Sequence, residues 1–168
     1  MSRIVLPTAE QLDALPVTYD AEVPPAYLDD NGHMNVQFYL AIATTSFADT
    51  LADMGFDDSY LADDRMSTFS IEHHVRYLAE LRLGDRIVVH GQVLDRSDRG
   101  LHLMTYIVNG TSGRLACTIE ATVLNVSLDS RGTTPFPDHV RDRVDAMIEK
   151  TRSEWPAPVC GVMGFGER

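Results

Sequence analysis

The sequence contains few cysteines, no cluster of basic residues and no long apolar segment. Its 168 residues include two cysteines, Cys117 and Cys160, which lack the spacing and the number of ligands that a zinc site needs, so we expect free thiols. Fourteen Lys and Arg against 25 Asp and Glu give a net charge of −11, and this charge, without a basic run, excludes nucleic acid as the main partner. The apolar stretch near the N-terminus ends at Pro7, too early for a signal peptide or a membrane span, so we expect a cytoplasmic protein with no membrane partner.

Motifs of several large enzyme classes are also absent. The sequence has no GxSxG segment, because Gly110 to Gly113 is one residue too short and lies in an expected turn. It has no phosphate-binding P-loop, no GxGxxG segment and no HExxH pair of histidines. These absences argue against serine hydrolases, nucleotide-binding enzymes and zinc proteases, and we expect neither a metal nor a cofactor.

Hydrophobic spacing predicts one long helix within a series of strands. Apolar residues recur every three or four positions from Val36 to about Met54, which is typical of an amphipathic helix, and Asn35 can cap its start. Strand-like segments separated by Gly, Asn and Asp turns come before and after it. The predicted strands cover 17–23, 68–78, 87–94, 101–108 and 115–128, and a charged second helix covers 141–152.

This order of elements predicts an α+β fold built as a single domain. Hairpin turns between the later strands favour an antiparallel sheet of about five strands, because parallel strands need helical crossovers. A sheet that wraps round one central helix is the hot-dog architecture. We expect a loosely attached lead-in at 1–16, the hot-dog domain at 17–140, and a C-terminal helix with an irregular tail at 141–168.

One polar segment before the central helix combines groups that can perform chemistry: Asp29-Asp30-Asn31-Gly32-His33-Met34-Asn35. The N-terminus of a helix offers unpaired N–H groups, which can stabilise the oxyanion formed from a thioester carbonyl. A carboxylate beside it can activate water or attack the carbonyl itself. An ordinary turn and helix cap would also use Asp, Asn and Gly, so the segment alone leaves both interpretations open.

The same segment resembles the signature of the hot-dog acyl-CoA thioesterases of the 4-hydroxybenzoyl-CoA thioesterase superfamily. That signature is Asp-x-x-Gly-(His or Val)-x-Asn, followed by Tyr-Leu within the central helix, here Tyr39 and Leu40. Within the superfamily the chain is most similar to betainyl-CoA thioesterases and to the thioesterase domains fused to some carnitine dehydrogenases, over residues 17–140. The matching blocks are 30–34, 71–76, 99–103 and 113–120.

The resemblance implies roles for residues of the polar segment. Asp29 matches the catalytic carboxylate, as general base or nucleophile, and Asp30 is a rival carboxylate with less suitable spacing. His33 and Asn35 match positions that orient water or the thioester. The backbone N–H groups that would bind the carbonyl oxygen include those of Gly32 and Met34.

The resemblance also implies a binding site for the acyl group. Carboxylates and aromatic faces would hold a quaternary ammonium such as the betainyl group, and the matching positions are Tyr39, Glu72, His74 and Glu120. His73 and His74 point to opposite faces of one strand, and the match favours His74 as the one that faces the helix. Glu72 and Glu120 could instead face solvent or pair with an arginine.

The remaining histidines and the arginines have less specific assignments. His102 alternates with apolar neighbours and is expected to be structural, whereas His90 and His139 are expected at the surface. Arginines would bind the phosphates of CoA because the guanidinium group fits phosphate, and the candidates are Arg82, Arg86, Arg96, Arg99 and Arg114.

Together these patterns predict an enzyme that hydrolyses a short polar acyl-CoA to the free acid and CoA, with betainyl-CoA of carnitine and betaine metabolism as the favoured substrate. A short-chain or aromatic acyl-CoA thioesterase is one alternative, and a non-catalytic acyl-CoA-binding protein is another. A hot-dog hydratase is disfavoured, because its Gly-Asp-x-Asn-Pro-x-His and His-x-x-x-x-Gly-Phe motifs are absent. The resemblance implies a homodimer or homotetramer with the active site between protomers.

Overall fold

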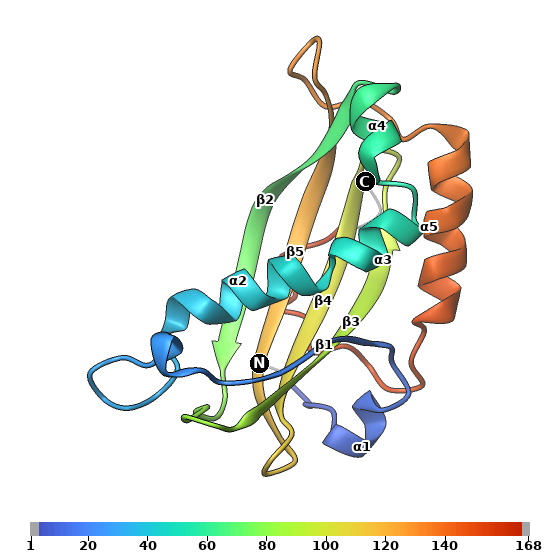
Figure 1. Cartoon of the computed structure of the whole chain (residues 1–168). Helices are drawn as coiled ribbons and strands as arrows, with labels where there is room; N and C mark the ends of the chain where they lie inside the picture. Colours follow the sequence, from blue (N-terminus) through green and yellow to red (C-terminus); the bar gives the residue numbers. More distant parts are fainter. Residues whose placement is uncertain (1–3, 166–168) are drawn as a thin grey trace.

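The computed structural model of the chain describes residues 4–165 and forms a five-stranded antiparallel sheet (Figure 1). The strands lie in the order β1-β3-β4-β5-β2, so β1 and β2 form the two edges. Their bounds are β1 (Val17–Glu22), β2 (Met66–Tyr77), β3 (Arg86–Arg96), β4 (Gly100–Asn109) and β5 (Arg114–Ser127). The expected antiparallel sheet of about five strands is confirmed.

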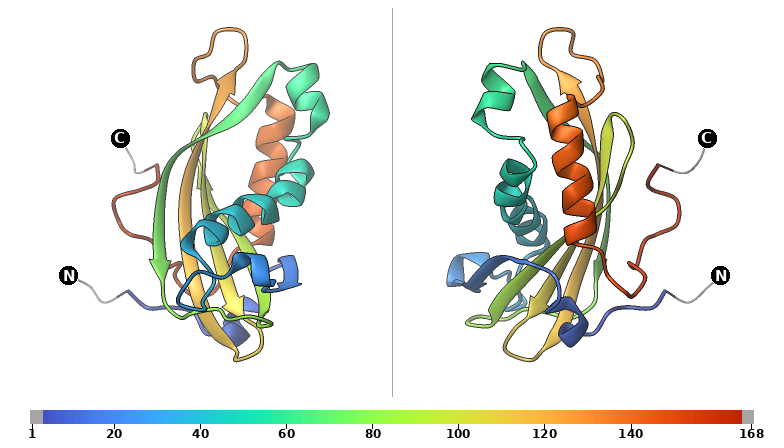
Figure 2. Two further views of the ribbon diagram at one scale, coloured as in Figure 1. Left: turned by 60° about the vertical axis from the view of Figure 1, so that its left-hand side comes forward. Right: turned by 90° about the vertical axis from the view of Figure 1, so that its right-hand side faces the viewer.

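Helices cover one face of this sheet, which we call the inner face (Figures 1 and 2). Buried Ile42 of α2 (Val36–Ser46) belongs to the same hydrophobic cluster as Ile119 of β5. The helices α3 (Ala48–Asp53) and α5 (Asp138–Lys150) lie beside it, and Val144 of α5 packs in a second cluster with Leu103 of β4. This arrangement confirms the α+β hot-dog architecture.

The central helix is interrupted at Phe47, although the hydrophobic spacing predicts a continuous helix over 36–54. Side-chain hydroxyls just before the interruption donate hydrogen bonds to backbone carbonyls of the preceding turn. Thr45 Oγ1 lies 2.9 Å from the Ala41 oxygen, and Ser46 Oγ lies 2.9 Å from the Ala43 oxygen. Such bonds compete with the helical ladder and bend helices, so the expected helix over 36–54 is present as two segments that meet at Phe47.

The lead-in packs on the opposite, outer face of the sheet. The short helix α1 (Ala9–Leu12) buries Leu12 completely, in a cluster with Tyr106 of β4. The expectation of a loosely attached lead-in is therefore wrong for its described part. His90 is also buried here, with Nδ1 3.2 Å from the Leu15 carbonyl oxygen, so its expected surface position is wrong too.

The tail after α5 passes the edge of β3 and runs over the outer face (Figure 2). Oγ1 of Thr151 accepts a hydrogen bond from the Val93 N–H at 3.1 Å, and thereby covers part of β3 that β1 leaves unpaired. The ring of Trp155 then packs edge-on against Tyr106, with ring centroids 5.5 Å apart. Residues 155–165 form no regular element, as expected. The parts of the predicted lead-in and tail at 1–3 and 166–168 lie outside the described residues.

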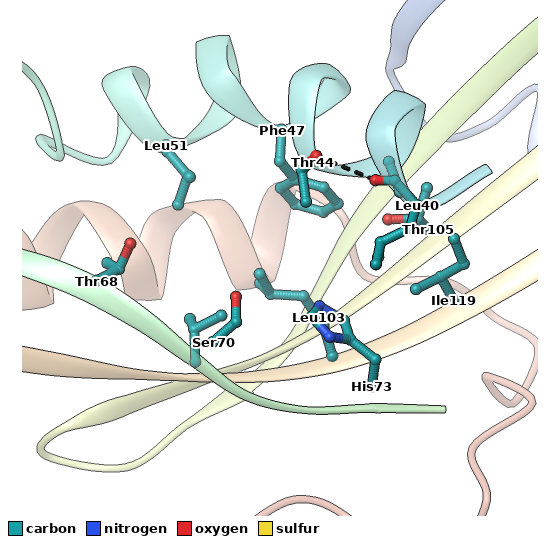
Figure 3. A pocket seen from close by; sticks show the side chains of 13 residues that line it. Leu40, Thr44, Phe47, Leu51, Thr68, Ser70, His73, Leu103, Thr105 and Ile119 are labelled. Atoms are coloured by element: carbon teal, nitrogen blue, oxygen red, sulfur yellow. Dashed lines mark hydrogen bonds between the residues drawn. The ribbon is translucent and has the colours of Figure 1, made fainter. Parts of the chain in front are cut away.

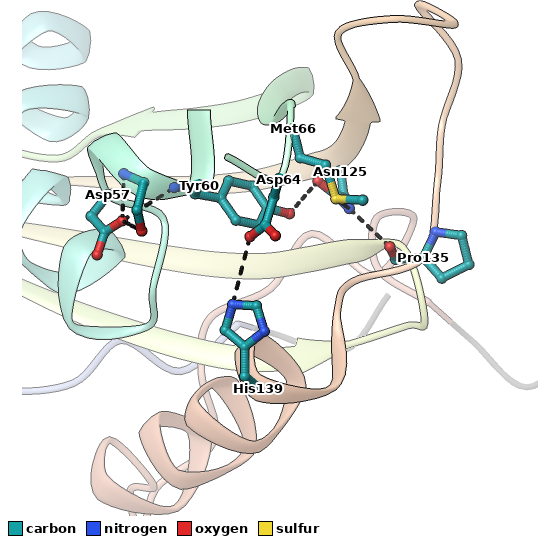
Figure 4. A network of polar contacts seen from close by, with 8 residues as sticks. Asp57, Tyr60, Asp64, Met66, Asn125, Pro135 and His139 are labelled. Carbon is teal, nitrogen blue, oxygen red and sulfur yellow. Dashed lines mark hydrogen bonds and ion pairs between the residues drawn. The ribbon is translucent and has the colours of Figure 1, made fainter. Parts of the chain in front are cut away.

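Short helices fall outside what hydrophobic spacing can predict, because a single turn buries too few side chains to show a period. The short helices are α1, η1 (Pro25–Tyr27) and α4 (Asp58–Ala62). The longer helix α5 was expected, but it begins at Asp138 rather than at residue 141. A polar network secures α4 near the start of β2 (Figure 4). The Tyr60 hydroxyl donates to Asn125 Oδ1 at 2.5 Å, and Nδ2 of Asn125 donates to the Pro135 carbonyl at 3.1 Å.

Candidate active site

The polar segment between η1 and α2 folds into a tight loop. Leu28 and Met34 pair as an isolated β-bridge, and the Asp29 N–H donates to the His33 carbonyl at 2.9 Å. Gly32 has a φ of +78°, a left-handed conformation that side chains with a Cβ adopt only at a cost. The loop therefore holds Asp29 and His33 close together just before the N-terminus of α2.

The carboxylate of Asp29 is half-buried and is held by the loop backbone. Its Oδ1 accepts hydrogen bonds from the N–H groups of Asn31 at 2.9 Å and His33 at 3.3 Å. Desolvation acts to raise the pKa of Asp29, but these N–H donors, together with the Asn31 side chain and the neighbouring His33, outweigh it and hold the pKa below the usual value. The carboxylate is therefore ionised at neutral pH, and its Oδ2 makes no hydrogen bond within the described part of the chain.

His33 is oriented by a residue that sequence reasoning missed. Its Nε2 lies 2.7 Å from Oε2 of Glu80, and Glu80 also forms an ion pair with Arg82. The backbones of His33 and Arg82 form a β-bridge, which brings this segment beside the loop. The sequence held one signal for Glu80. Glu80 and Arg82 lie on either side of Leu81, which is buried, and alternation along an extended segment predicts that their side chains share one face.

Two of the expected oxyanion donors are already engaged. The Gly32 N–H donates to the Asp29 carbonyl at 3.0 Å, and the Met34 N–H donates to the Leu81 carbonyl at 2.7 Å. The structure therefore does not present either N–H to a substrate. Among the described residues, the Val36 N–H at the first position of α2 has no acceptor, as is usual at a helix start.

Asn35 and Tyr39 frame the beginning of α2. Oδ1 of Asn35 accepts the Gln37 N–H at 3.1 Å, which confirms Asn35 as the helix cap. Tyr39 is 4% exposed and contacts the Tyr77 ring edge-on, with centroids 5.2 Å apart. Burial raises the pKa of Tyr39 to about 12, so its hydroxyl stays neutral in the core.

A cavity of about 200 Å³ lies between α2 and the inner face of the sheet (Figure 3). Apolar side chains form most of its wall, and β2 contributes three polar residues, one of which is His73. Figure 3 shows the His73 ring beneath α2, beside Leu103. The lining residues are Leu40, Ala43, Thr44, Phe47, Leu51, Thr68, Ser70, His73, Leu103, Thr105, Ile119, Ala121 and Val123.

Three of the residues expected to bind a quaternary ammonium lie together, but on the face of the sheet opposite to Tyr39, which packs in the core with α2. His74 pairs across strands with Glu120, and Glu72 pairs with Thr122. Because paired residues point to the same face, and Ala121 between these two β5 residues lines the inner cavity, all four lie on the outer face. The expectation that His74 faces the helix is therefore wrong, since His73 occupies that side.

Glu120 is instead part of a buried contact with the tail. Its Oε1 lies 2.8 Å from Nε2 of His102, and its Oε2 accepts the Cys160 N–H at 2.7 Å. Glu120 is 1% exposed, so these two bonds satisfy a carboxylate that would otherwise be costly to bury. His102 is structural, as expected, while His139 is exposed, also as expected, 3.6 Å from Asp64.

The five candidate arginines for the CoA phosphates differ in their partners. Arg86 binds Asp20 through Nε at 2.8 Å, and Arg96 binds Asp145 through Nε at 2.6 Å, so both charges are partly neutralised. Arg82 pairs with Glu80 beside the loop. Arg99 and Arg114 form no ion pair with a described residue.

Two further observations concern metals and membranes. Within residues 4–165, no three side chains of His, Cys, Asp or Glu gather as metal ligands would. The described helices include none with the length and apolar character to cross a membrane. Both cysteines are free, as expected.

Comparison with known proteins identifies the family. The model of the Thioesterase-like superfamily matches residues 23–144. The betainyl-CoA thioesterase of Pseudomonas aeruginosa is 32% identical over 136 residues, which are 81% of this chain and 86% of that protein. The L-carnitine dehydrogenase/betainyl-CoA thioesterase of Rhizobium meliloti is 28% identical over 77% of this chain, but the match spans only 26% of that longer protein.

Solved structures share the same fold. A Staphylococcus aureus protein solved in complex with CoA has a TM-score of 0.80 and 21% identity, over 90% of this chain and 97% of that one. A 1,4-dihydroxy-2-naphthoyl-CoA thioesterase from Synechocystis has a TM-score of 0.67 and 16% identity, over 76% of this chain and 93% of that one. With the family match over 23–144 and the 32% identical relative, the chain belongs to the thioesterase-like superfamily, and its enzyme class is thioester hydrolysis.

Proposed function

We propose that this protein hydrolyses short acyl-CoA thioesters to the free acid and CoA, with Asp29 as the catalytic carboxylate. The observation that carries the proposal is the Asp29 carboxylate itself. It is ionised, is fixed by two backbone N–H donors through Oδ1, and keeps Oδ2 without a partner in the described chain. It also lies just before the N-terminus of α2, where a developing negative charge is stabilised.

In the proposed step, Asp29 accepts a proton from water while the water oxygen adds to the thioester carbonyl carbon. The Val36 N–H and the positive end of α2 stabilise the resulting oxyanion. The C–S bond then breaks, and the CoA thiolate takes a proton as the acid is released. Direct attack by Asp29 on the carbonyl is the other route open to the same carboxylate. Neither route uses a metal or a cofactor.

Betainyl-CoA is the first acyl-CoA to test, because the curated relatives are named as betainyl-CoA thioesterases. Activity on betainyl-CoA would place the enzyme in carnitine and betaine metabolism.

One observation favours a second candidate substrate, a thioester with an uncharged short acyl group. The cavity beneath α2 has no carboxylate in its lining, and Phe47 is its one aromatic residue among the described side chains. Two free thiols suit a reducing compartment, which supports a cytoplasmic location.

The test compares release of the CoA thiol from betainyl-CoA and from 3,3-dimethylbutyryl-CoA, which has the same shape but no charge. Asp29→Asn should lower kcat at least about 100-fold with both, in line with the loss of a general base. Asp30→Asn is the matched control at the exposed neighbouring carboxylate, and it should keep full activity. Tight binding of both thioesters without turnover by the unmodified protein would instead establish an acyl-CoA-binding protein.

We also propose that the active enzyme is a homodimer, or a tetramer of such dimers, formed by pairing of the β2 edges. β2 is a long edge strand and exposes the large apolar side chains Phe69 and Ile71, which are 63% and 50% exposed. An exposed apolar edge of this kind is a ready template for another strand. Thr68, Ser70 and His73 of this strand line the cavity, so a second copy would lie next to the acyl site.

A further inference from the structure

We infer that His73 determines which acyl groups the active site accepts, by contacting the acyl portion inside the cavity beneath α2. This inference rests on the proposed thioesterase function. It assigns a specificity role to the histidine that faces the helices, in place of His74 on the outer face.

The chemistry of the cavity points to His73. It is the one ionisable side chain among the lining residues, which otherwise comprise apolar side chains and four hydroxyls. Of these hydroxyls, Thr44 Oγ1 is already bonded to the Leu40 and Ala41 carbonyls, at 3.0 and 2.9 Å. His73 makes no hydrogen bond to a described residue, so its ring nitrogens remain free to meet an acyl group.

The strand geometry explains why adjacent histidines have different roles. The register of β2 against β5 shifts between Ser70 and Glu72, which marks a β-bulge. The extra residue lets Ser70 and His73 face the same cavity although they are three positions apart. His74 therefore lies on the outer face, where its Nδ1 is buried without a partner among the described residues.

The position of His73 gives it a direct electrostatic effect on the acyl group. An acyl group enters a cavity whose other lining residues carry no ionisable side chain, so any charge placed at position 73 is opposed by little else. A quaternary ammonium and its uncharged isostere fill the same space and differ in this interaction alone. The ratio of kcat/KM for betainyl-CoA to that for 3,3-dimethylbutyryl-CoA therefore reports on position 73.

The experiment measures this ratio in the full chain and in two matched variants. His73→Glu places a carboxylate in the cavity and should raise the ratio roughly tenfold or more, because opposite charges a few ångströms apart attract strongly in a partly enclosed site. His74→Glu makes the same change at the adjacent position on the outer face, and should leave the ratio within about twofold. A ratio that rises in His74→Glu but not in His73→Glu overturns the inference.

A second comparison protects the test against loss of folding. If His74→Glu does not fold, Glu72→Lys reverses the charge at an exposed position of the same outer face. An unchanged ratio supports the inference, and a tenfold fall overturns it. If the unmodified protein hydrolyses neither thioester, the proposed function fails, and calorimetric dissociation constants for the same two thioesters supply the ratio. His73→Glu must then still shift it, or the inference fails separately.

Discussion

At the scale of single residues, the protonation of Asp29 sets the acid limit of activity. Its pKa is held below the usual value, so the carboxylate stays ionised as the pH falls from 7 towards 4, and activity that needs the ionised form should persist over this range. The pH profile of kcat/KM is the measurement. If kcat/KM falls between pH 5 and 6, and falls over the same range in His33→Gln, the assignment of Asp29 as the base is contradicted.

The two cysteines should differ sharply in reactivity. Cys117 is fully buried, and burial raises the pKa of its thiol to about 12, so it carries almost no thiolate at neutral pH. Cys160 is partly exposed in the tail. A thiol-specific reagent should label Cys160 in the native protein and Cys117 only after unfolding. Labelling of native Cys160→Ser at neutral pH would show that the core opens readily.

Strand β2 also shows which side-chain positions could be predicted from the sequence and which could not. Alternation correctly places His73 and His74 on opposite faces. Which of them faces the helix depends on the bulge between Ser70 and Glu72, and that bulge is created by pairing with β5. Pairing partners are not encoded in the local sequence, so the local sequence could not show that His73, rather than His74, faces the helix. The Asp29 loop could be identified as a candidate site because its residues are close in sequence, whereas Glu80 reaches His33 only through the fold.

At the scale of elements, the loop before α2 depends on the left-handed conformation of Gly32. Gly32→Ala should lower the free energy of unfolding by about 1 kcal/mol, because nothing lies within 4 Å of the added Cβ and only the backbone is strained. It should also lower kcat several-fold by displacing Asp29. Gly84 has the same φ of +78° and equally open surroundings, so Gly84→Ala should cost similar stability but no activity. Equal activity losses in both variants would count against a special role for the loop.

Most of the helices and strands were predictable, and the exceptions depend on features that the spacing of apolar residues does not register. Long strands and the start of α2 follow from period and cap, which are local signals. The break at Phe47 comes from hydroxyl bonds of Thr45 and Ser46, which the apolar period does not register. Among the described residues of the lead-in, Pro7, Leu12 and Leu15 are buried, which are too few to show a pattern.

At the scale of the whole molecule, the apolar edge of β2 should control assembly. Ile71→Lys places a charge on this edge, which disfavours strand pairing, and should convert a dimer into monomers with reduced thioesterase activity. Light scattering measures the mass. Leu61→Lys is the control, because Leu61 is also 50% exposed but lies on α4. A monomer before any substitution would contradict an active site between protomers.

The two ends of the sheet also differ in their capacity to recruit another strand. At one edge of the sheet, β1 is only six residues long, and the Val93 N–H of β3 beyond it donates to Thr151 Oγ1. Few backbone groups therefore remain at this edge for pairing with another strand. The twelve residues of β2 form the long edge on the other side. A chain with one receptive end can join one copy through a two-fold axis, and that union consumes the end. If copies pair through β2 as proposed, sheet extension would therefore terminate at two subunits, and growth into a fibre would be disfavoured.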